Sequence, residues 1–177
     1  MTSGEIHALL TERLGDAVSL VDSVEYAHGT AKRAVSALTV ELPRERLHDA
    51  VAALCDATSP HVTVISGDDR DASLILNYHF NVGWGEHGRE VVLTLRVTLP
   101  KDDLSIPTLT DLIPGALTTE REGHEFYGIE FVGIPDDRNL FLPEGTTIHP
   151  WRRDEAATKL VEPTVKRLVK WETRDGQ

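Results

Sequence analysis

Three successive segments rich in β-branched and aliphatic residues constrain the fold most strongly. They read HVTVIS (61–66), ASLILNYHFNV (72–82) and REVVLTLRVTL (89–99). This composition is typical of strands, because branched side chains pack well on a pleated surface. The last two segments are separated by the short, glycine-rich GWGEHG, so we expect them to form one long hairpin.

The residues before these strands predict two helices and two further strands. Thr2 and Glu5 have the spacing of a capping box at the start of a helix. Residues 17–24 and 34–42 are predicted strands, and Pro43 is expected to open a second helix. The order helix–strand–strand–helix–strand–strand–strand predicts an α+β fold. Its small antiparallel or mixed sheet should carry the helices on one face.

The chain changes character after Pro100, where six prolines and five glycines fall between residues 100 and 150. Such punctuation breaks long elements. We therefore expect an α+β core domain over 1–100 and an extended partner-binding arm with a terminal helix over 101–177. The elements expected in this second part are a short helix near 108–113, a helix near 116–127, a strand at 129–132 and a final helix at 155–172.

Aromatic residues are concentrated in this second part. Five of the ten aromatics of the chain lie between residues 126 and 151, namely Phe126, Tyr127, Phe131, Phe141 and Trp151. An extended segment with so many aromatics leaves apolar surface in water unless a partner covers it. The pattern therefore favours an interaction surface.

The composition excludes several classes of protein. The net charge is −11, from 18 Lys and Arg against 29 Asp and Glu, which argues against binding nucleic acid or lying on an anionic membrane. Cys55 is the single cysteine and falls on the apolar face of a predicted helix, so it is expected to be a buried apolar residue. We expect no signal peptide and no direct membrane insertion, since no apolar run approaches the length of a bilayer crossing.

Two candidate motifs favour a structural interpretation. GWGEHG matches G-x-G-x-x-G, but a strand-like segment follows it where a dinucleotide site needs a helix. His79, His87 and His124 invite a metal hypothesis, yet H-E-x-x-H is absent and no three donors converge in the pattern. We expect no metal and no cofactor in this chain.

The stretch EREGHEFYG (120–128) is the strongest candidate for a functional site. Its carboxylates could serve acid–base chemistry, and a stand-alone hydrolase using Glu120, Glu122 or His124 is one hypothesis. A charge cluster beside aromatics is also a candidate for specific docking, because desolvated charges must be paired.

The region from Ile106 to Asp154 resembles a known family. The matching pieces are TDLIPGA (110–116), ERE (120–122), FYGIEFVGIPDDR (126–138), LFLPE (140–144) and HPWRRD (149–154). In this order they resemble the signature region of the C subunit of NADH:quinone oxidoreductase, respiratory complex I. They are equally similar to the corresponding subunit of membrane-bound, energy-converting nickel–iron hydrogenases.

The resemblance implies a non-catalytic subunit in the peripheral arm of an ion-pumping electron-transfer complex. Its partners would be the hydrogenase-like large subunit and a small iron–sulfur subunit. Iron–sulfur clusters and a quinone or nickel–iron site would lie in those partners. The chain would be held by them at the cytoplasmic face of the cell membrane. A free scaffold protein that has kept the family surface is a further alternative.

Specific roles follow from this interpretation. Phe126 and Tyr127 would anchor in apolar pockets of the partner. Gly128 would permit a sharp turn, and Asp136 would hold a turn through its own backbone. The full set of expected partner-binding residues is Glu120, Arg121, Glu122, Phe126, Tyr127, Gly128, Pro135, Asp136, Arg138, Leu142, Pro143, Trp151 and Arg152.

Overall fold

The computed structural model describes residues 1–28, 30, 33–85, 90–154 and 159. Its helices are α1 (Ser3–Leu14), α2 (Leu47–Ala57) and α3 (Ala116–Tyr127), with short 3-10 turns at Gly15–Ala17 and Arg44–Arg46. The strands are β1 (Ser19–His28), β2 (Arg33–Glu41), β3 (His61–Asp69), β4 (Ser73–Val82), β5 (Val91–Pro100), β6 (Ser105–Pro107) and β7 (Glu130–Val132).

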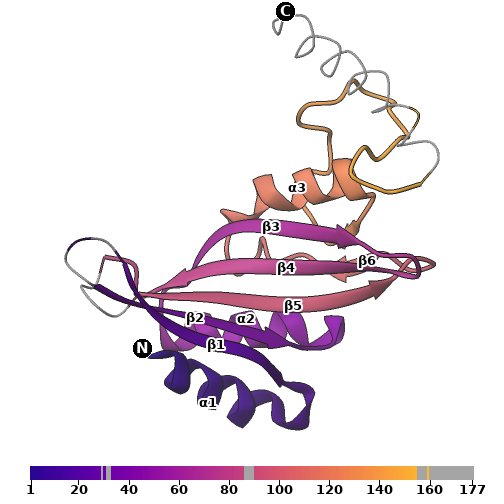
Figure 1. Ribbon diagram of the computed structural model, residues 1–177. Helices are drawn as coiled ribbons and strands as arrows, with labels where there is room; N and C mark the ends of the chain where they lie inside the picture. Colours follow the sequence, from indigo (N-terminus) through magenta and orange to yellow (C-terminus); the bar gives the residue numbers. More distant parts are fainter. Residues whose placement is uncertain (29, 31–32, 86–89, 155–158, 160–177) are drawn as a thin grey trace, which may run out of the picture.

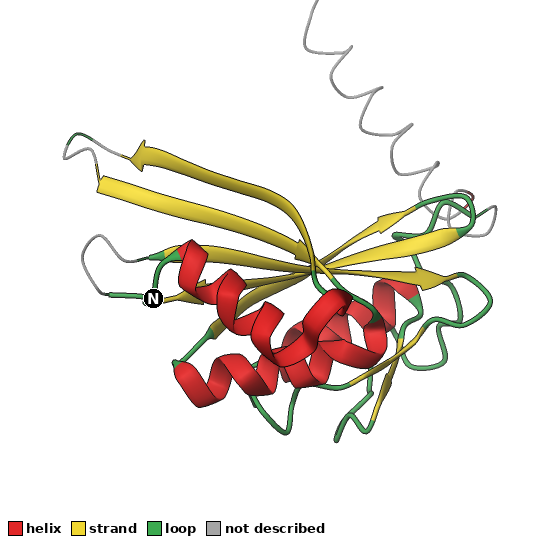
Figure 2. Ribbon diagram, turned by 90° about the horizontal axis from the view of Figure 1, so that it is seen from below, coloured by secondary structure: helices red, strands yellow, loops and turns green. Residues whose placement is uncertain are grey.

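The main sheet has five strands in the order β1-β2-β5-β4-β3 (Figure 1). All neighbours are antiparallel except β2 and β5, which run parallel, so the sheet is mixed. The predicted α+β class and the long β4–β5 hairpin are confirmed; the hairpin register runs from Ser73 opposite Pro100 to Val82 opposite Val91. The helices lie on one side of this sheet (Figure 2). A second, two-stranded parallel sheet joins β6 to β7.

The core forms between the sheet and the helices. Alternate residues of β4 point to this side and are buried: Leu74, Leu76, Tyr78, Phe80 and Val82. The intervening β4 residues are only half-buried, as expected for a sheet with one face turned away from the helices. The period-two pattern of the sequence therefore fixes which face of the sheet receives the helices.

The beginnings of the first two helices follow different signals. At α1, Thr2 accepts a hydrogen bond from the Glu5 amide and Glu5 accepts one from the Thr2 amide, so the predicted capping box is confirmed. Pro43 is followed by a 3-10 turn, and α2 begins only at Leu47.

Cys55 of α2 is half-buried against the core, and burial raises the pKa of its thiol. A thiol that resists ionisation is a poor nucleophile.

The second part of the chain holds one correct helix prediction and one wrong one. The predicted helix at 116–127 is α3, and the strand expected at 129–132 is β7. The helix expected near 108–113 does not form. Only one turn forms there, in which the Leu112 and Ile113 amides both donate to the Leu109 carbonyl, while Thr108 stays paired with the Val132 carbonyl at the end of β7. The helix expected at 155–172 lies outside the described residues, apart from Lys159.

The hydrophobic core continues past Pro100. Ile106, Leu109, Ile129 and Phe131 belong to the same buried cluster as the strands of the main sheet. The core therefore extends from the main sheet into the second part of the chain as far as Phe131. The division into 1–100 and 101–177 stays a prediction. Residues 133–154, all of which the structure describes, contain neither helix nor strand. We call them the distal arm; they follow β7 in the chain and lie beside α3 (Figure 1).

Candidate partner-binding site

Glu120, the first residue of EREGHEFYG, is directed into the fold. It is fully buried on α3, where it accepts hydrogen bonds from the Thr108 hydroxyl at 2.5 Å and the Leu109 amide at 2.7 Å. Burial raises the pKa of Glu120 to about 6, although these two donors oppose the shift. Glu120, which we expected to bind a partner, thus uses both carboxylate oxygens within its own chain.

Arg121 holds the first turn of the distal arm. Its guanidinium donates to the carbonyls of Arg138, at 2.8 Å, and Asn139, at 3.2 Å, and lies 3.4 Å from the carboxylate of Asp136. Asp136 also accepts a hydrogen bond from the Arg138 amide, so the predicted turn held through its own backbone is confirmed. Two further bonds from the Arg138 guanidinium lower the pKa of Asp136.

Glu125 holds the next three residues of the distal arm. Its carboxylate accepts hydrogen bonds from the backbone amides of Leu140, Phe141 and Leu142. The residue is 3% exposed. Sequence reasoning did not place it among the partner-binding residues, although an acid one turn after Arg121 on the same helix was a usable signal.

Three aromatic rings form a stack that we call the aromatic ladder (Phe126, Phe141 and Trp151). The ring centroids of Phe126 and Trp151 lie 4.3 Å apart at an interplanar angle of 21°, and those of Phe126 and Phe141 lie 5.9 Å apart at 20°. Phe141 is 70% exposed and Trp151 is 45% exposed. Phe141 was counted among the aromatics of the sequence but not among its site residues.

Tyr127 belongs to the interior. It is buried, and its hydroxyl donates to the Gly67 carbonyl of β3 at 2.8 Å. A Cβ atom at Gly67 would come within 2.6 Å of the tyrosine ring, so the absence of a side chain in β3 makes room for it. The anchor that we expected in a partner is therefore an anchor between α3 and the sheet.

Gly128 ends α3 and allows the distal arm to return over it. Its φ of 73° is the left-handed conformation that glycine adopts without strain, which confirms the predicted turn. A Cβ atom here would lie 2.7 Å from the His149 ring. His149 Nδ1 donates to the Glu125 carbonyl at 2.9 Å, and the Trp151 amide donates to the Phe126 carbonyl at 3.1 Å.

The end of the distal arm is tied to the main sheet by Asp69. This buried β3 residue accepts a hydrogen bond from the Arg153 amide at 2.6 Å and lies 2.8 Å from the Lys101 ammonium. Burial by itself would raise the pKa of Asp69, but these two donors outweigh it and hold the pKa below its usual value. Arg152 is half-buried, 3.7 Å from Asp154.

The remaining predicted residues lie at the surface to different degrees. Pro135 and Pro143 are exposed, whereas Glu122 and Leu142 are half-buried. The predicted site residues thus separate into two groups. Glu120 and Tyr127 are buried inside the fold. Phe141 and Trp151 of the aromatic ladder and the exposed residues of the distal arm are accessible to solvent.

The geometry does not assemble a hydrolytic centre from Glu120, Glu122 and His124. Both oxygens of Glu120 are occupied by donors of its own chain, and His124 Nδ1 donates to the Ile129 carbonyl at 2.8 Å. Glu122 and His124 are two residues apart on a helix, so their side chains do not face each other. Among the described residues, no group of three or more His, Cys, Asp or Glu could hold a metal ion.

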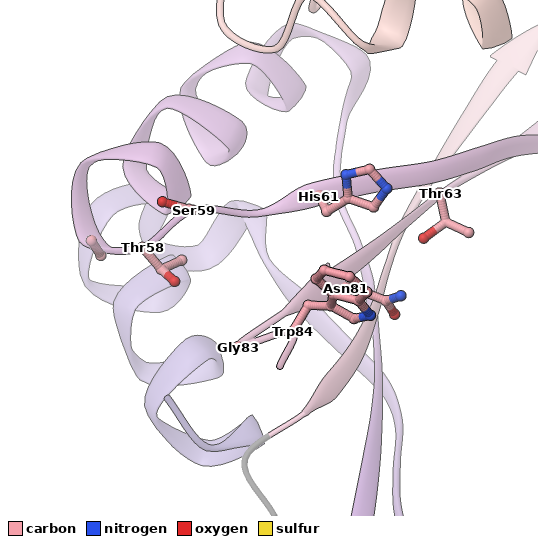
Figure 3. A pocket seen from close by; sticks show the side chains of 8 residues that line it. Thr58, Ser59, His61, Thr63, Asn81, Gly83 and Trp84 are labelled. Atoms are coloured by element: carbon pink, nitrogen blue, oxygen red, sulfur yellow. The ribbon is translucent and has the colours of Figure 1, made fainter. Parts of the chain in front are cut away.

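A pocket of about 720 Å³ lies at the start of β3 and the β4–β5 loop (Figure 3). The lining residues are Ala57, Thr58, Ser59, His61, Thr63, Asn81, Gly83 and Trp84. Among these eight, the imidazole of His61 is the one side chain that titrates near neutral pH. No carboxylate pair or activated nucleophile is present among these described lining residues.

Three relatives of known sequence are similar to parts of this chain. Membrane-bound hydrogenase subunit beta of Pyrococcus furiosus is 45% identical over 67 residues, 37% of this chain and 39% of that protein. The C/D subunit of NADH-quinone oxidoreductase from Phocaeicola vulgatus is 30% identical over 127 residues, 65% of this chain and 22% of that protein. NADH-quinone oxidoreductase subunit 5 of Thermus thermophilus is 42% identical over 74 residues, 41% and 34% of the two chains. The chain thus matches less than half the length of these relatives.

Solved structures agree on the fold. A chain of the archaeal membrane-bound sulfane sulfur reductase superposes with a TM-score of 0.71 at 20% identity, covering 92% of this chain and 91% of that one. The trypsin-resistant fragment of Nqo5 superposes with a TM-score of 0.51 at 28% identity, covering 64% and 89%. None of the helices in the described ranges combines the length and apolarity needed to cross a bilayer.

The family comparison covers strands β3, β4 and β5 of the main sheet and the candidate site. The sequence profile described as "Respiratory-chain NADH dehydrogenase, 30 Kd subunit" matches residues 40–161, which is more than half of the chain. That range contains α3, the aromatic ladder and the whole distal arm. The chain therefore belongs to the family of the 30 kDa subunit of respiratory-chain NADH dehydrogenase.

Proposed function

We propose that this protein is a non-catalytic, peripheral-arm subunit of a membrane-associated, ion-pumping electron-transfer complex. It docks on the hydrogenase-like large subunit through the distal arm. The observation that carries the proposal is the aromatic ladder, which is held in place by its own chain and yet leaves Phe141 and Trp151 open to solvent. Ordered, exposed aromatics are the side chains that contribute most at protein interfaces.

Charged groups beside the ladder support a protein partner. The guanidinium groups of Arg138 and Arg153 are largely exposed in a chain whose net charge is −11. In this proposal the donors of these guanidinium groups that are not used within the chain bond to carboxylate or carbonyl oxygens of the partner, while the ladder enters an apolar recess. An apolar centre with a polar, charged rim is the usual arrangement of a specific interface.

The partner chains supply the redox chemistry in this proposal. Iron–sulfur clusters, and a quinone or nickel–iron site, belong to the large subunit and to a small iron–sulfur subunit. A chain with one cysteine cannot provide the thiolate set of a cluster by itself. These partners hold the protein at the cytoplasmic face of the membrane.

The test is co-expression with the hydrogenase-like large subunit, followed by affinity recovery from solubilised membranes. We expect Phe141→Ala to reduce the recovered large subunit at least tenfold and to leave the melting temperature unchanged, because the ring is exposed in the free chain. Trp84→Ala, which removes another exposed aromatic outside the distal arm, is the matched control. Recovery of the large subunit at the wild-type level by Phe141→Ala would refute this docking surface.

A further inference from the structure

We propose that Glu125 is the positioning residue of the docking surface and fixes the direction in which Phe141 is presented. This inference rests on the proposed function, because it concerns how the same surface is held ready for its partner. The residue itself touches no partner. It acts through the backbone of residues 140–142.

The contacts of Glu125 are unusually concentrated. Its two carboxylate oxygens accept hydrogen bonds from three successive backbone amides, at 2.9 Å from Leu140, at 3.1 and 3.2 Å from Phe141, and from Leu142. At 3% exposure the carboxylate has lost nearly all contact with water. A buried charge is tolerated only where such donors replace its hydration, and hydrogen bonds to a charged group are roughly twice as strong as neutral ones.

This geometry determines where the phenylalanine ring lies. Successive amides that point at one anion curve the backbone into a concave nest. The amides face the carboxylate, so the side chain of the middle residue, Phe141, is left on the outside. The ring is 70% exposed, and it is steadied by stacking on Phe126, the helix residue next to Glu125. One turn of α3 thus holds both the backbone and the ring.

The outward direction of Phe141 is the feature that needs a reason beyond folding. A loop that served only to cover α3 would bury its largest apolar side chain. Here Glu125 is buried and Phe126 is half-buried, whereas the ring of Phe141 remains largely exposed to water. A preorganised loop binds with less loss of conformational entropy than a free one, so the clamp raises the affinity for a partner that accepts this ring.

The experiment uses the full chain and four variants: Glu125→Gln, Phe141→Ala, the double variant of these two, and Glu122→Gln. Glutamine keeps the size of the side chain but replaces one acceptor with an amide donor that faces backbone donors. In hydrogen exchange we expect the amides of 140–142 to exchange at least tenfold faster in Glu125→Gln, with β4 and β5 unchanged. Glu122→Gln, a charge removed from the same helix at a half-buried position, should leave 140–142 unchanged.

Recovery of the co-expressed large subunit is the second measurement. We expect Glu125→Gln to lower it about as far as Phe141→Ala, and the double variant to be no worse than Phe141→Ala alone. That non-additivity is the signature of a residue that acts through Phe141, and a general loss of stability would not produce it. If Glu125→Gln fails to fold, Glu125→Asp, which keeps the charge on a shorter side chain, is measured in the same way.

The outcomes separate the two proposals. Unchanged exchange at 140–142 overturns the clamp, and additive losses in the double variant overturn its role in presenting Phe141. If Phe141→Ala recovers the large subunit normally, the proposed docking surface is wrong, and the exchange data still decide whether the clamp exists.

Discussion

The buried carboxylate of Glu120 shows how a motif that looks like a surface charge cluster is used inside the fold. Its neighbours are the Thr108 hydroxyl and the Leu109 amide, and the phenol of Tyr78 is buried nearby on β4. Proximity to Glu120 adds to the effect of burial in raising the pKa of Tyr78. Glu120 therefore connects the loop after β6 to α3, and it gives stability a dependence on pH.

We predict that Glu120 contributes less to the free energy of unfolding as the pH rises from 4.5 past 6. The pKa of about 6 in the folded protein exceeds the ordinary value of 4.5, so the folded state favours the protonated acid. The stabilisation is full below pH 4.5 and is lost as the pH passes 6, a difference of about 2 kcal/mol. Urea unfolding of wild type and Glu120→Gln between pH 4 and pH 7 measures it.

Wild type and Glu120→Gln must be compared with each other because other carboxylates change the free energy of unfolding with pH in the opposite direction. The pKa values of Asp103 and Asp136 are lowered in the folded state, so their contributions grow as the pH rises. They cancel in the difference between wild type and Glu120→Gln. A difference that stays constant from pH 4 to pH 7 would show that Glu120 does not hold a proton in the fold.

At the scale of elements, α3 organises the second half of the molecule. Glu120, Arg121 and Glu125 each fix a different segment: the loop after β6, the turn at 136–139 and the loop at 140–142. The carbonyls of Glu125 and Phe126 receive the return of the distal arm at its end. The charged residues of the helix therefore shape the arm, and the aromatic ladder is the part left for a partner.

We predict that the junction between α3 and the distal arm depends on two properties of Gly128. Gly128→Ala places a side chain in the left-handed conformation and also pushes against His149, which a Cβ atom would approach to 2.7 Å. Gly145→Ala imposes the same backbone strain with nothing within 4 Å. We expect losses of about 3 kcal/mol for the first and about 1 kcal/mol for the second in chemical denaturation.

The two glycine variants also differ in where the damage falls. The imidazole resonances of His149 in NMR spectra should shift in Gly128→Ala and stay in place in Gly145→Ala. Equal losses of stability in the two variants would mean that the contact with His149 contributes nothing.

At the scale of the whole molecule, both ends of the distal arm are attached to the part of the fold that contains the main sheet. It starts at β7, whose Phe131 lies in the core, and it returns to the main sheet at Asp69 of β3. The ring of Phe131 also lies 3.1 Å from the place where a Cβ atom of Gly123 would be, so α3 and β7 are in close contact. The arm is thus fastened at both ends of its described length.

We predict that Asp69→Asn releases the far end of the arm. The neutral amide offers a single acceptor where the carboxylate serves both the Arg153 amide and the Lys101 ammonium. Amides of 151–154 should exchange faster, and the free energy of unfolding should fall by about 2 kcal/mol at pH 7. Because the pKa of Asp69 is lowered in the fold, the gap between wild type and variant should narrow as the pH falls below 4.

Asp102→Asn, at an exposed position, is the matched control and should leave exchange at 151–154 unchanged. If Asp69→Asn alters neither exchange nor stability, the end of the arm is held by other contacts.

Local patterns in the sequence determined the elements of this protein. The β-branched and aliphatic composition of β4 and β5, the capping box of α1, and the glycine after α3 are local signals, so they can be recognised without tertiary structure. The same is true of the Asp136 turn, whose partner is two residues away. The order of motifs from 110 to 154 carried the family, and the family comparison confirms it.

Tertiary structure alone decided which side of α3 each motif residue serves. Glu120 bonds to residues 11 and 12 positions earlier, Glu125 to residues 15 to 17 positions later, and Tyr127 to a residue 60 positions earlier. No periodicity encodes such partners, because they depend on how distant segments pack. For the same reason the sequence suggested a helix at 108–113, where the structure pairs the Thr108 amide with the distant Val132 carbonyl and forms only a single turn at Leu109.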